Sequence, residues 1–516
     1  MCRPSPSRAV SRWSLRRPLQ RCSSLRMNNA SPSRLALISS REGSTARSSS
    51  AGSWERHSRI RSARASIKGC MGRSGAVTIV DTGAKEHRMG LCHGILSHPT
   101  PGPELLHQTL ANGSRCVLAP MPESPLTCLD FWCRAGSASE GNGEEGLAHF
   151  LEHMVFKGSD RLNAGEFDLR IEALGGSSNA ATGFDDVHFH ALVPPDAAAE
   201  GLELLLDLVL QPALQAEAFA MERDVVLEEI AQYRDQPDEQ VIQQLLAACC
   251  PDQAYGRPIL GWESSLQASD PEAMRQFHRH RYQGPQCCLA IAGALPAGWE
   301  HWLQSSALAG LDSKGDAPPG PSEPMLHFRP GRQEQRVPRL EAARLLMAWP
   351  APPAQEQTTL MGFDLATTVL AEGRRSRLVQ HLREELQIVE SIDMDLTSLE
   401  QGSLVMLEAC CPPDLVTRVE AEVCAVLKAM VDAPIESQEL DRARHLVGNG
   451  LRFSLEAPGS VAAIAGAQTL WRGPQALLDP LLQMEAWDGP SLRERIFPAL
   501  QPELASTLIA LPADPA

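Results

Sequence analysis

The feature that most constrains this chain is the segment GLAHFLEHMVFKGS, residues 146–159. It spaces His149, Glu152 and His153 as i, i+3 and i+4 within an apolar stretch. In an α-helix these positions share one face, so both imidazoles can reach one metal ion with the carboxylate beside them. The pattern arises by chance in roughly 3% of chains of this length and composition. The alternative interpretation is therefore a helix surface whose polar side chains are satisfied without a metal.

A second segment offers a third metal ligand. Glu229 lies in MERDVVLEEI, residues 221–230, and Glu222 stands seven residues before it, two helical turns away on the same face. A catalytic zinc ion takes three protein ligands and keeps one position open. A helix that offers Glu229 would complete a site with two histidines, and Glu222 would be free to hydrogen-bond one of them from behind.

The first half of the chain predicts strands and helices mixed in an α+β pattern. Strands are expected where β-branched and aromatic residues lie between Pro and Gly, as in CVLAP, LTCLDFWCRAGS and QCCLAIAGAL. The segment 177–194, SSNAATGFDDVHFHALVP, predicts two strands around a Gly-Phe-Asp turn. In the second half LLMAWPAP is strand-like and TLMGFDLATTVLAEG is helical.

Local end signals predict where the helices of the first half begin and end. The helix that carries the histidines is expected to end at Gly158. Asn163 is expected to cap the next helix, with Glu166 three residues further on as in a capping box. Asp196 is expected to begin a third helix, and a fourth helix should stop at Pro237.

The length of 516 residues favours two domains of roughly 200 residues each. The Gly/Pro/Ser-rich stretch GLDSKGDAPPGPSEP predicts a linker between them. We therefore expect an N-terminal domain at 105–305, a linker at 306–326 and a C-terminal domain at 327–516. Residues 1–100 are expected to be a disordered, transit-like or wrongly assigned extension.

Charge is distributed unevenly along the chain. Residues 1–70 hold 15 Lys/Arg and 2 Asp/Glu, which leaves 32 against 61 in the rest, a net charge near −29. The basic, Ser-rich start is typical of an organelle transit peptide, and the alternative is a start codon placed too early, since Met71 and Met89 follow. The acidic remainder makes a nucleic-acid partner improbable, and it favours either cationic partners or simple solubility.

The cysteines and the apolar runs limit the cellular setting. None of the 14 cysteines forms a C-x-x-C motif, and three pairs are adjacent in sequence, which favours reduced thiols over a cysteine-bound metal. No apolar run reaches the roughly 18–20 residues needed to cross a bilayer. A soluble, cytoplasmic protein is expected, or one of an organelle stroma or matrix if the transit peptide is genuine.

Three segments together resemble the M16 metallopeptidases, the inverzincin group that includes the mitochondrial processing peptidase β-subunit, pitrilysin and bacterial M16B peptidases. They are GLAHFLEHMVFKGS, IEALGGSSNAAT and ERDVVLEEI. The resemblance implies one Zn²⁺ per chain, held by His149, His153 and Glu229. It also implies that Glu152 acts as general base on zinc-bound water and that Glu222 supports a ligand.

The resemblance runs from about Leu105 to the C-terminus and is strongest over residues 135–235. It implies the LuxS/MPP-like metallohydrolase fold, in which two homologous-type halves each have an antiparallel sheet flanked by helices, with a C-terminal half of the inactive type. It further implies that the SSNAAT strand, including Asn179 and Ala180, pairs with an extended substrate by strand addition.

The second half departs from the family pattern. Single-chain members carry an Arg and a Tyr there that reach the substrate; Arg383 matches the Arg, but Glu390 stands at the tyrosine position. The chain's three tyrosines all lie in its first half, at Tyr233, Tyr255 and Tyr282. We therefore expect a homologous partner subunit that carries the Arg/Tyr pair, in a heterodimer, or else a homodimer.

The expected function is that of a zinc-dependent metalloendopeptidase acting on extended peptides or unfolded small proteins. The alternative is a non-catalytic structural, assembly or peptide-binding subunit of M16 descent. His188 and His190 alternate with apolar residues on one strand, so they point to one side, and a satisfied or solvated pair is favoured there over metal ligands. His278 and His280 are interpreted as part of a basic helix end.

Overall fold

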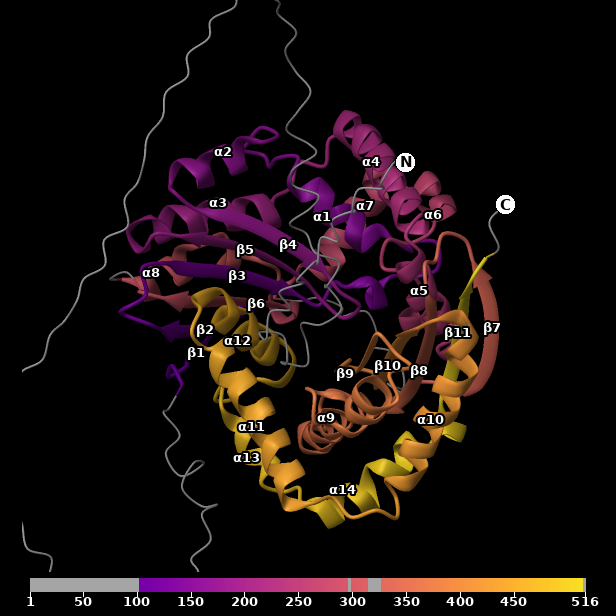
Figure 1. The fold of residues 1–516 in the computed structure, drawn as a ribbon. Coiled ribbons are helices and arrows are strands. Elements are labelled where there is room, and N and C mark those ends of the chain that lie inside the picture. The colour runs from indigo at the N-terminus through magenta and orange to yellow at the C-terminus, as the bar shows by residue number, and fades with distance from the viewer. Residues whose placement is uncertain (1–101, 296–297, 314–325, 514–516) are drawn as a thin grey trace, which may run out of the picture. The chain divides into compact units, whose positions relative to one another are not determined.

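Two β-sheets, each flanked by helices, make up the described part of the chain (Figure 1). The computed structural model describes residues 102–295, 298–313 and 326–513, all within one compact unit. The expected extension at residues 1–100 and most of the expected linker lie outside the described residues. The α+β class with two helix-flanked sheets is confirmed.

The first sheet has six strands in the order β1-β2-β6-β3-β5-β4. In that order they are β1 (Leu106–Thr109), β2 (Arg115–Pro120), β6 (Cys287–Gly293), β3 (Thr127–Cys133), β5 (Val187–Val193) and β4 (Ser177–Thr182). β2 and β6 run parallel, and the other neighbours run antiparallel. The sheet is therefore not purely antiparallel, because β6 returns to the middle of the sheet after a long helical excursion. β4 forms one edge.

The helices of the first half fall between and after these strands. They are α1 (Leu147–Val155), α2 (Glu166–Ala173), α3 (Ala198–Leu210), α4 (Ala216–Arg234), α5 (Pro237–Cys249), α6 (Glu263–Ala268), α7 (Pro271–Arg281) and α8 (Trp299–Ser305). The strands and helices expected from the sequence in this half are present. α7 ends in the predicted basic segment with His280 exposed, but burial lowers the pKa of His278 to about 4, and its ring contacts the Val209 carbonyl at 2.9 Å.

Two predicted helix starts are wrong in detail. α2 begins at Glu166 with Gly165 before it, and Glu166 accepts hydrogen bonds from the Asn163 backbone and side chain. The Glu166 carboxylate thus reaches back to the Asn163 N–H as the expected capping box requires, but Gly165 stands directly before α2 and the Asn163 side chain does not cap it. Asp196 belongs to a short 3₁₀ turn, Pro195–Ala197, that leads into α3 without a side-chain cap. A Pro-led turn can feed a helix directly, so no polar cap is needed there.

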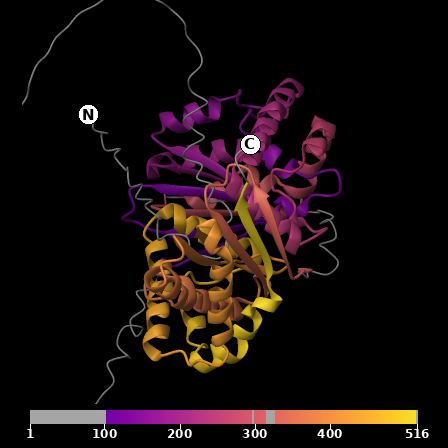
Figure 2. The ribbon, with the colours of Figure 1, turned by 45° about the vertical axis from the view of Figure 1, so that its right-hand side comes forward.

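The second sheet has five strands in the order β7-β11-β8-β10-β9. They are β7 (Gly331–Val337), β11 (Ser506–Pro512), β8 (Ala343–Ala351), β10 (Ser403–Cys411) and β9 (Ser391–Thr397). Figure 2 shows the yellow strand β11 between its two neighbours, β7, which is parallel to it, and β8, which is antiparallel. The helices of this half are α9 (Gln357–Ala371), α10 (Val416–Ala429), α11 (Ser437–Ser454), α12 (Pro458–Arg472), α13 (Asp479–Met484) and α14 (Gly489–Arg495).

One helix of each half packs on the sheet of the other half. Phe131 and Phe189 face one side of the first sheet and pack with α1 and α3, whereas Trp132 faces the other side and packs with α12. Gly466 of α12 lies so close to Trp132 that a Cβ there would meet the indole at 2.6 Å. Reciprocally, α5 covers a face of the second sheet through residues such as Leu245. The two sheets are thus buried on both faces only when both halves are present.

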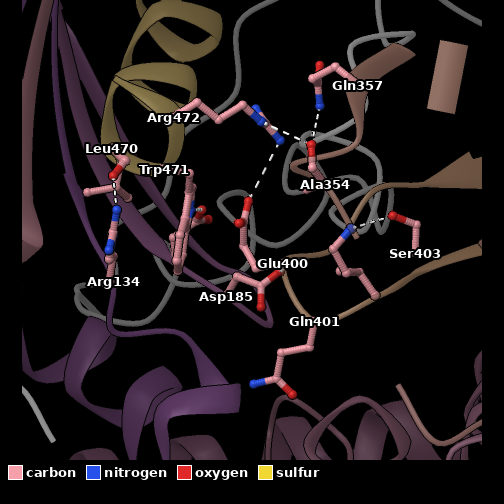
Figure 3. Close-up of polar contacts among 12 residues, drawn as sticks. Arg134, Asp185, Ala354, Gln357, Glu400, Gln401, Ser403, Leu470, Trp471 and Arg472 are labelled. Atoms are coloured by element: carbon pink, nitrogen blue, oxygen red, sulfur yellow. Dashed lines mark hydrogen bonds and ion pairs between the residues drawn. The ribbon is translucent and has the colours of Figure 1, made fainter. Parts of the chain in front are cut away.

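Polar contacts join the two halves at the turn between β4 and β5 (Figure 3). Asp185 accepts hydrogen bonds from the Tyr255 hydroxyl at 2.7 Å and from the Glu400 backbone N–H at 3.0 Å. The Tyr255 oxygen in turn accepts from the Gln401 N–H at 3.0 Å. Burial raises the pKa of Asp185 to about 7, although its hydrogen bond from Tyr255 opposes the shift.

The neighbouring residue Asp186 is held by α12. It accepts a hydrogen bond from Trp471 Nε1 at 2.8 Å, and the Arg134 guanidinium lies 4.4 Å from the centre of the Trp471 ring (Figure 3). Arg472 of α12 forms an ion pair with Glu400, with 3.7 Å between the guanidinium nitrogen and the carboxylate oxygen. The turn that leads from the edge strand β4 into β5 is therefore fixed by residues of the second half.

Across the described residues, no helix combines the length and the apolar character needed to cross a membrane.

We expect Tyr255→Phe to lower the free energy of unfolding by about 1–3 kcal/mol, because the Gln401 N–H would lose its acceptor in a buried place. The Tyr255 side chain is only 1% exposed. The midpoint and slope of urea-induced unfolding, followed by tryptophan fluorescence, measure the change. Tyr233→Phe is the matched control, since the Tyr233 hydroxyl bonds to the partly exposed Glu239. Equal midpoints for Tyr255→Phe and the unchanged protein would contradict the role given to this contact.

Candidate metal centre

The start of α1 is fixed by a buried carboxylate. Glu140, 7% exposed, accepts hydrogen bonds from the Gly146 N–H at 3.1 Å and from the Ala148 N–H at 2.8 Å. These N–H groups are unpaired at a helix start, where the helix dipole also favours an acid. Gly146 has φ +94°, and a Cβ there would meet the Leu260 carbonyl oxygen at 2.4 Å. Glycine is therefore required at this position.

α1 buries its apolar face in the first core and leaves its polar face toward α4 and β4. Its apolar residues, such as Phe150 and Met154, lie in the first core. Phe150 packs against Phe219 of α4 with ring centres 4.6 Å apart, which holds the two helices together. The polar residues of α1 are left on the side that faces α4 and β4.

The structure brings His149, His153 and Glu229 together, with their ligand atoms within 4.8 Å of one another. Glu229 Oε2 lies 3.3 Å from His153 Nε2 and 3.7 Å from His149 Nε2. Ligands of a tetrahedral zinc ion, each about 2.0–2.2 Å from the metal, lie about 3.3–3.6 Å from one another. The two distances from Glu229 are therefore close to the spacing that such an ion requires.

Glu222 contacts the Nδ1 side of the His153 ring, the side away from Glu229. Its Oε1 lies 3.0 Å from His153 Nδ1, and its Oε2 lies 2.6 Å from Lys157 Nζ. Since Nδ1 faces a carboxylate, the ring is expected to carry its proton there, which leaves Nε2 free to bind a metal. The interpretation of Glu222 as a supporting carboxylate thus agrees with its position on α4, two turns before Glu229.

Electrostatics favour a cation between these groups. Burial opposes protonation of His153, but hydrogen bonds to Glu222 and Glu229 outweigh it and raise the pKa of the ring to about 9. Burial also acts against the charged forms of Glu222 and Glu229, yet contacts with His153 hold the pKa of both carboxyls below the ordinary value. A third acid, Glu152, lies on the same face of α1 as His149 and His153. The three carboxylates together thus attract a cation to the site.

The donor set fits a zinc ion. Two imidazoles and one carboxylate are common zinc ligands, and three protein ligands leave a position for a further group. Burial, followed by the effect of His153, lowers the pKa of His149, which keeps that ring neutral as a metal ligand must be. His149 Nδ1 is buried with no hydrogen-bond partner in the described part of the chain, so the polar contacts of this ring lie at Nε2.

Glu152 is oriented by the edge strand of the first sheet. The Thr182 hydroxyl of β4 donates a hydrogen bond to Glu152 Oε2 at 2.5 Å. Asn179 and Ala180 lie on the same strand, whose outer edge has no neighbouring strand within the described sheet. An edge strand beside the cluster can accept an extended peptide through backbone hydrogen bonds.

The second-half candidate residues lie apart from this cluster. Arg383 sits in a π-helical segment, Val379–Glu385, where its guanidinium pairs with Glu384 at 2.8 Å. Glu390 precedes β9, and its backbone N–H donates to the Cys410 carbonyl. Among the contacts of the described residues, Arg383 does not touch His149, His153 or Glu229.

Sequence reasoning missed Glu140, Lys157 and Thr182. Glu140 stands six residues before Gly146, a separation with no capping-motif signal. Lys157 lies one turn beyond His153, and this spacing could have shown that it shares the face of the histidines. Thr182 likewise had no signal, since its contact with Glu152 depends on how the sheet meets α1.

Two family models match the chain one after the other. The model described as insulinase (peptidase family M16) matches residues 116–263, and the one described as peptidase M16 inactive domain matches residues 269–447. The chain belongs to peptidase family M16.

Curated relatives and solved structures agree with this family. An "uncharacterized zinc protease" of Rickettsia bellii is 25% identical over 75% of this chain and 94% of its own length. The Bacillus subtilis "uncharacterized zinc protease YmxG" is 26% identical over 72% of this chain and 90% of its own length. A crystal structure of a protease from Helicobacter pylori, 22% identical, covers 80% of this chain and 100% of its own with a TM-score of 0.72. At this identity, the likeness to the Helicobacter pylori structure shows the fold alone.

We expect Glu222→Gln to weaken Zn²⁺ binding by about 10–100-fold, because His153 loses the carboxylate that fixes its ring. Competition with a chromophoric chelator measures the affinity. Glu217→Gln is the control, since Glu217 lies exposed on the same helix. Unchanged affinity in Glu222→Gln would show that the His153 ring is oriented without Glu222.

Proposed function

We propose that this protein is a zinc-dependent endopeptidase that cleaves extended peptides or unfolded small proteins. The observation that carries the proposal is the convergence of His149, His153 and Glu229 at near-tetrahedral spacing, with Glu152 on the same helix face. Relatives named zinc proteases support the choice of metal. Membership of family M16 supports the class of reaction.

In this proposal His149, His153 and Glu229 hold the zinc ion, which when bound polarises the peptide carbonyl and makes water a stronger acid. Glu152 serves as the general base that accepts the proton of the attacking water and later donates it to the leaving amine. The Thr182 hydroxyl, bonded to Glu152 Oε2, orients this carboxylate and leaves Oε1 for the proton transfer. Glu222 and Lys157 keep the His153 ring in place.

The substrate is proposed to bind as an added strand along β4. Backbone pairing reads an extended chain without requiring a particular sequence, which suits unfolded segments. Thr182 lies at the end of β4 nearest Glu152, so a peptide paired with Asn179 and Ala180 would run toward the cluster. The contact of the β4–β5 turn with Tyr255 and Glu400 would keep this strand in position.

A homologous partner subunit is proposed to complete the site. The oxyanion that forms during peptide hydrolysis needs hydrogen-bond donors, and a carboxylate such as Glu390 can only accept when ionised. Arg383 pairs with Glu384 in this chain. That arrangement also supports a second candidate, a subunit that binds zinc and peptides without turnover. A partner that carries an Arg and a Tyr would separate the two candidates.

We expect Glu152→Gln to lower peptide cleavage by at least about 10²–10⁴-fold while about one zinc ion per chain remains bound, because the base is lost and the proposed ligands are kept. Cleavage of a pool of unstructured peptides and elemental analysis measure the two properties. Glu172→Gln, at an exposed position on α2, is the control. Equal cleavage by Glu152→Gln and the unchanged protein would overturn the role of Glu152.

The partner is tested by mixing the chain with an M16 homologue that carries the Arg/Tyr pair. We expect a mixed dimer in light scattering and cleavage faster by about 10²-fold, the effect typical of an oxyanion donor. The control is the same homologue with its tyrosine changed to phenylalanine. Should the chain alone, as a monomer or homodimer, cleave as fast as the mixture, the partner is unnecessary.

A further inference from the structure

A second group of possible metal ligands lies on the opposite face of the first sheet. Asp130 of β3 and His188 and His190 of β5 place their ligand atoms within 4.8 Å of one another, the same limit that holds for His149, His153 and Glu229. Asp130 is directly opposite His190 in the strand register. We refer to Asp130, His188 and His190 as the strand cluster.

Strand alternation separates the strand cluster from the proposed active site. Phe131 and Phe189 point to the face that packs on α1, so Asp130, His188 and His190 point to the other face. On that face Trp132 stacks on the His188 ring at 4.2 Å and packs beneath α12. The two groups of ligands therefore cannot share one ion.

A structural ion pair explains only part of the strand cluster. Asp130, 1% exposed, lies with Oδ1 3.0 Å from His188 Nδ1, and a buried carboxylate needs such a partner. His190 has no such explanation. Within the described chain its ring forms no hydrogen bond, and it stacks on His188 with the ring centres 5.7 Å apart. The interpretation of a satisfied or solvated pair thus accounts for both rings, His188 as an ion-pair partner and His190 as a partly exposed ring, and it leaves the nitrogens of His190 available to a ligand.

The surroundings add negative charge. Asp186 directly precedes β5, two residues before His188, and Trp471 Nε1 of α12, the helix that covers this face, donates to it. Asn179 and Ala181 of β4 lie opposite His190 and His188 in the register and contribute no charge. Two basic groups offset part of the charge of Asp186: Arg472 of α12, which also lies 3.7 Å from Glu400, and Arg134, which stacks on Trp471.

We propose that Asp130, His188 and His190 form a second binding site for a divalent transition-metal ion. Two imidazoles and one carboxylate suit Zn²⁺, Co²⁺, Mn²⁺ or Fe²⁺, and they do not suit Ca²⁺ or Mg²⁺, which prefer oxygen ligands alone. A bound ion would link β3 to β5, the strand that supports the edge strand β4. It would also use the free nitrogen of His190 and offset the charge of Asp130 and Asp186.

The test counts metal ions on full-length variants. Each chain is stripped with a chelator and titrated with Co²⁺, whose visible absorption reports its ligands, and with Zn²⁺ followed by dialysis and elemental analysis. We expect two ions on the unchanged chain, one on His190→Gln, one on the double variant His149→Gln/His153→Gln and none on the triple variant that combines all three changes. His280→Gln, at an exposed position on α7, should keep two ions.

Thermal unfolding gives a readout that does not depend on catalysis. Zn²⁺ should raise the melting temperature of His149→Gln/His153→Gln and leave that of the triple variant unchanged, because an ion that binds only the folded state stabilises it. The proposal is overturned if the double variant binds no ion, or if His190→Gln binds as many ions as the unchanged chain.

The outcomes also separate this proposal from the proposed function. Loss of metal from His190→Gln together with unchanged metal on His149→Gln/His153→Gln would support the strand cluster and contradict the proposed catalytic site. If His190→Gln does not fold, the double variant still decides the question, because the strand cluster is intact in it. One Co²⁺ on that variant supports the second site, and none overturns it.

Discussion

The contact on which the candidate site depends is the bridge formed by the His153 ring between two glutamates of one helix. Nδ1 faces Glu222 and Nε2 faces Glu229, at 3.0 and 3.3 Å. Because α4 presents both acids on one face, a single histidine fixes the rotation of α1 against α4. That rotation places His149 and Glu152 as well, since they stand on the same side of α1. The Phe150–Phe219 contact sets the distance between the helices, and Glu140 sets where α1 begins.

Much of this arrangement could be predicted from the sequence, and the reasons are local. The spacing of His149, Glu152 and His153 defines a helix face by itself, and the seven-residue interval between Glu222 and Glu229 does the same on α4. The strand pair around Gly183 is also predictable, because alternation and turn residues are local signals. The meeting of Glu222 and Glu229 with the remote histidines was expected through the family resemblance, but other contacts between remote segments had no such signal. Thr182 reaches Glu152, and Asp185 meets Glu400, only because a sheet edge happens to lie beside a helix and a second sheet. The side chain of Asn163 was expected to cap α2. Instead Gly165 stands directly before the helix, and the Glu166 carboxylate accepts a hydrogen bond from the Asn163 N–H.

The two faces of the first sheet each carry a group of histidine and carboxylate side chains. One face supports α1 and α4, where carboxylates and imidazoles meet beside an open strand edge. The other face carries Asp130, His188 and His190 and is covered by α12. β5 contributes to both, because its apolar residues line the core beneath α1 and its histidines point the opposite way. Any change that shifts β5 along β3 by one residue would exchange these faces, turn His188 and His190 toward the core beneath α1 and so break up the strand cluster.

The exchange of helices between the halves has a consequence for how the protein can be divided. A boundary drawn through the linker separates two stretches of sequence, yet it does not separate two folding units. A fragment that ends after β6 would retain every proposed zinc ligand and would expose Trp132, Cys288 and Ala290, which α12 covers in the whole chain. A fragment of the second half would expose the sheet face beneath α5 in the same way. The proposed zinc site therefore cannot be excised for expression, or fused to another protein, without the half that bears none of the proposed ligands.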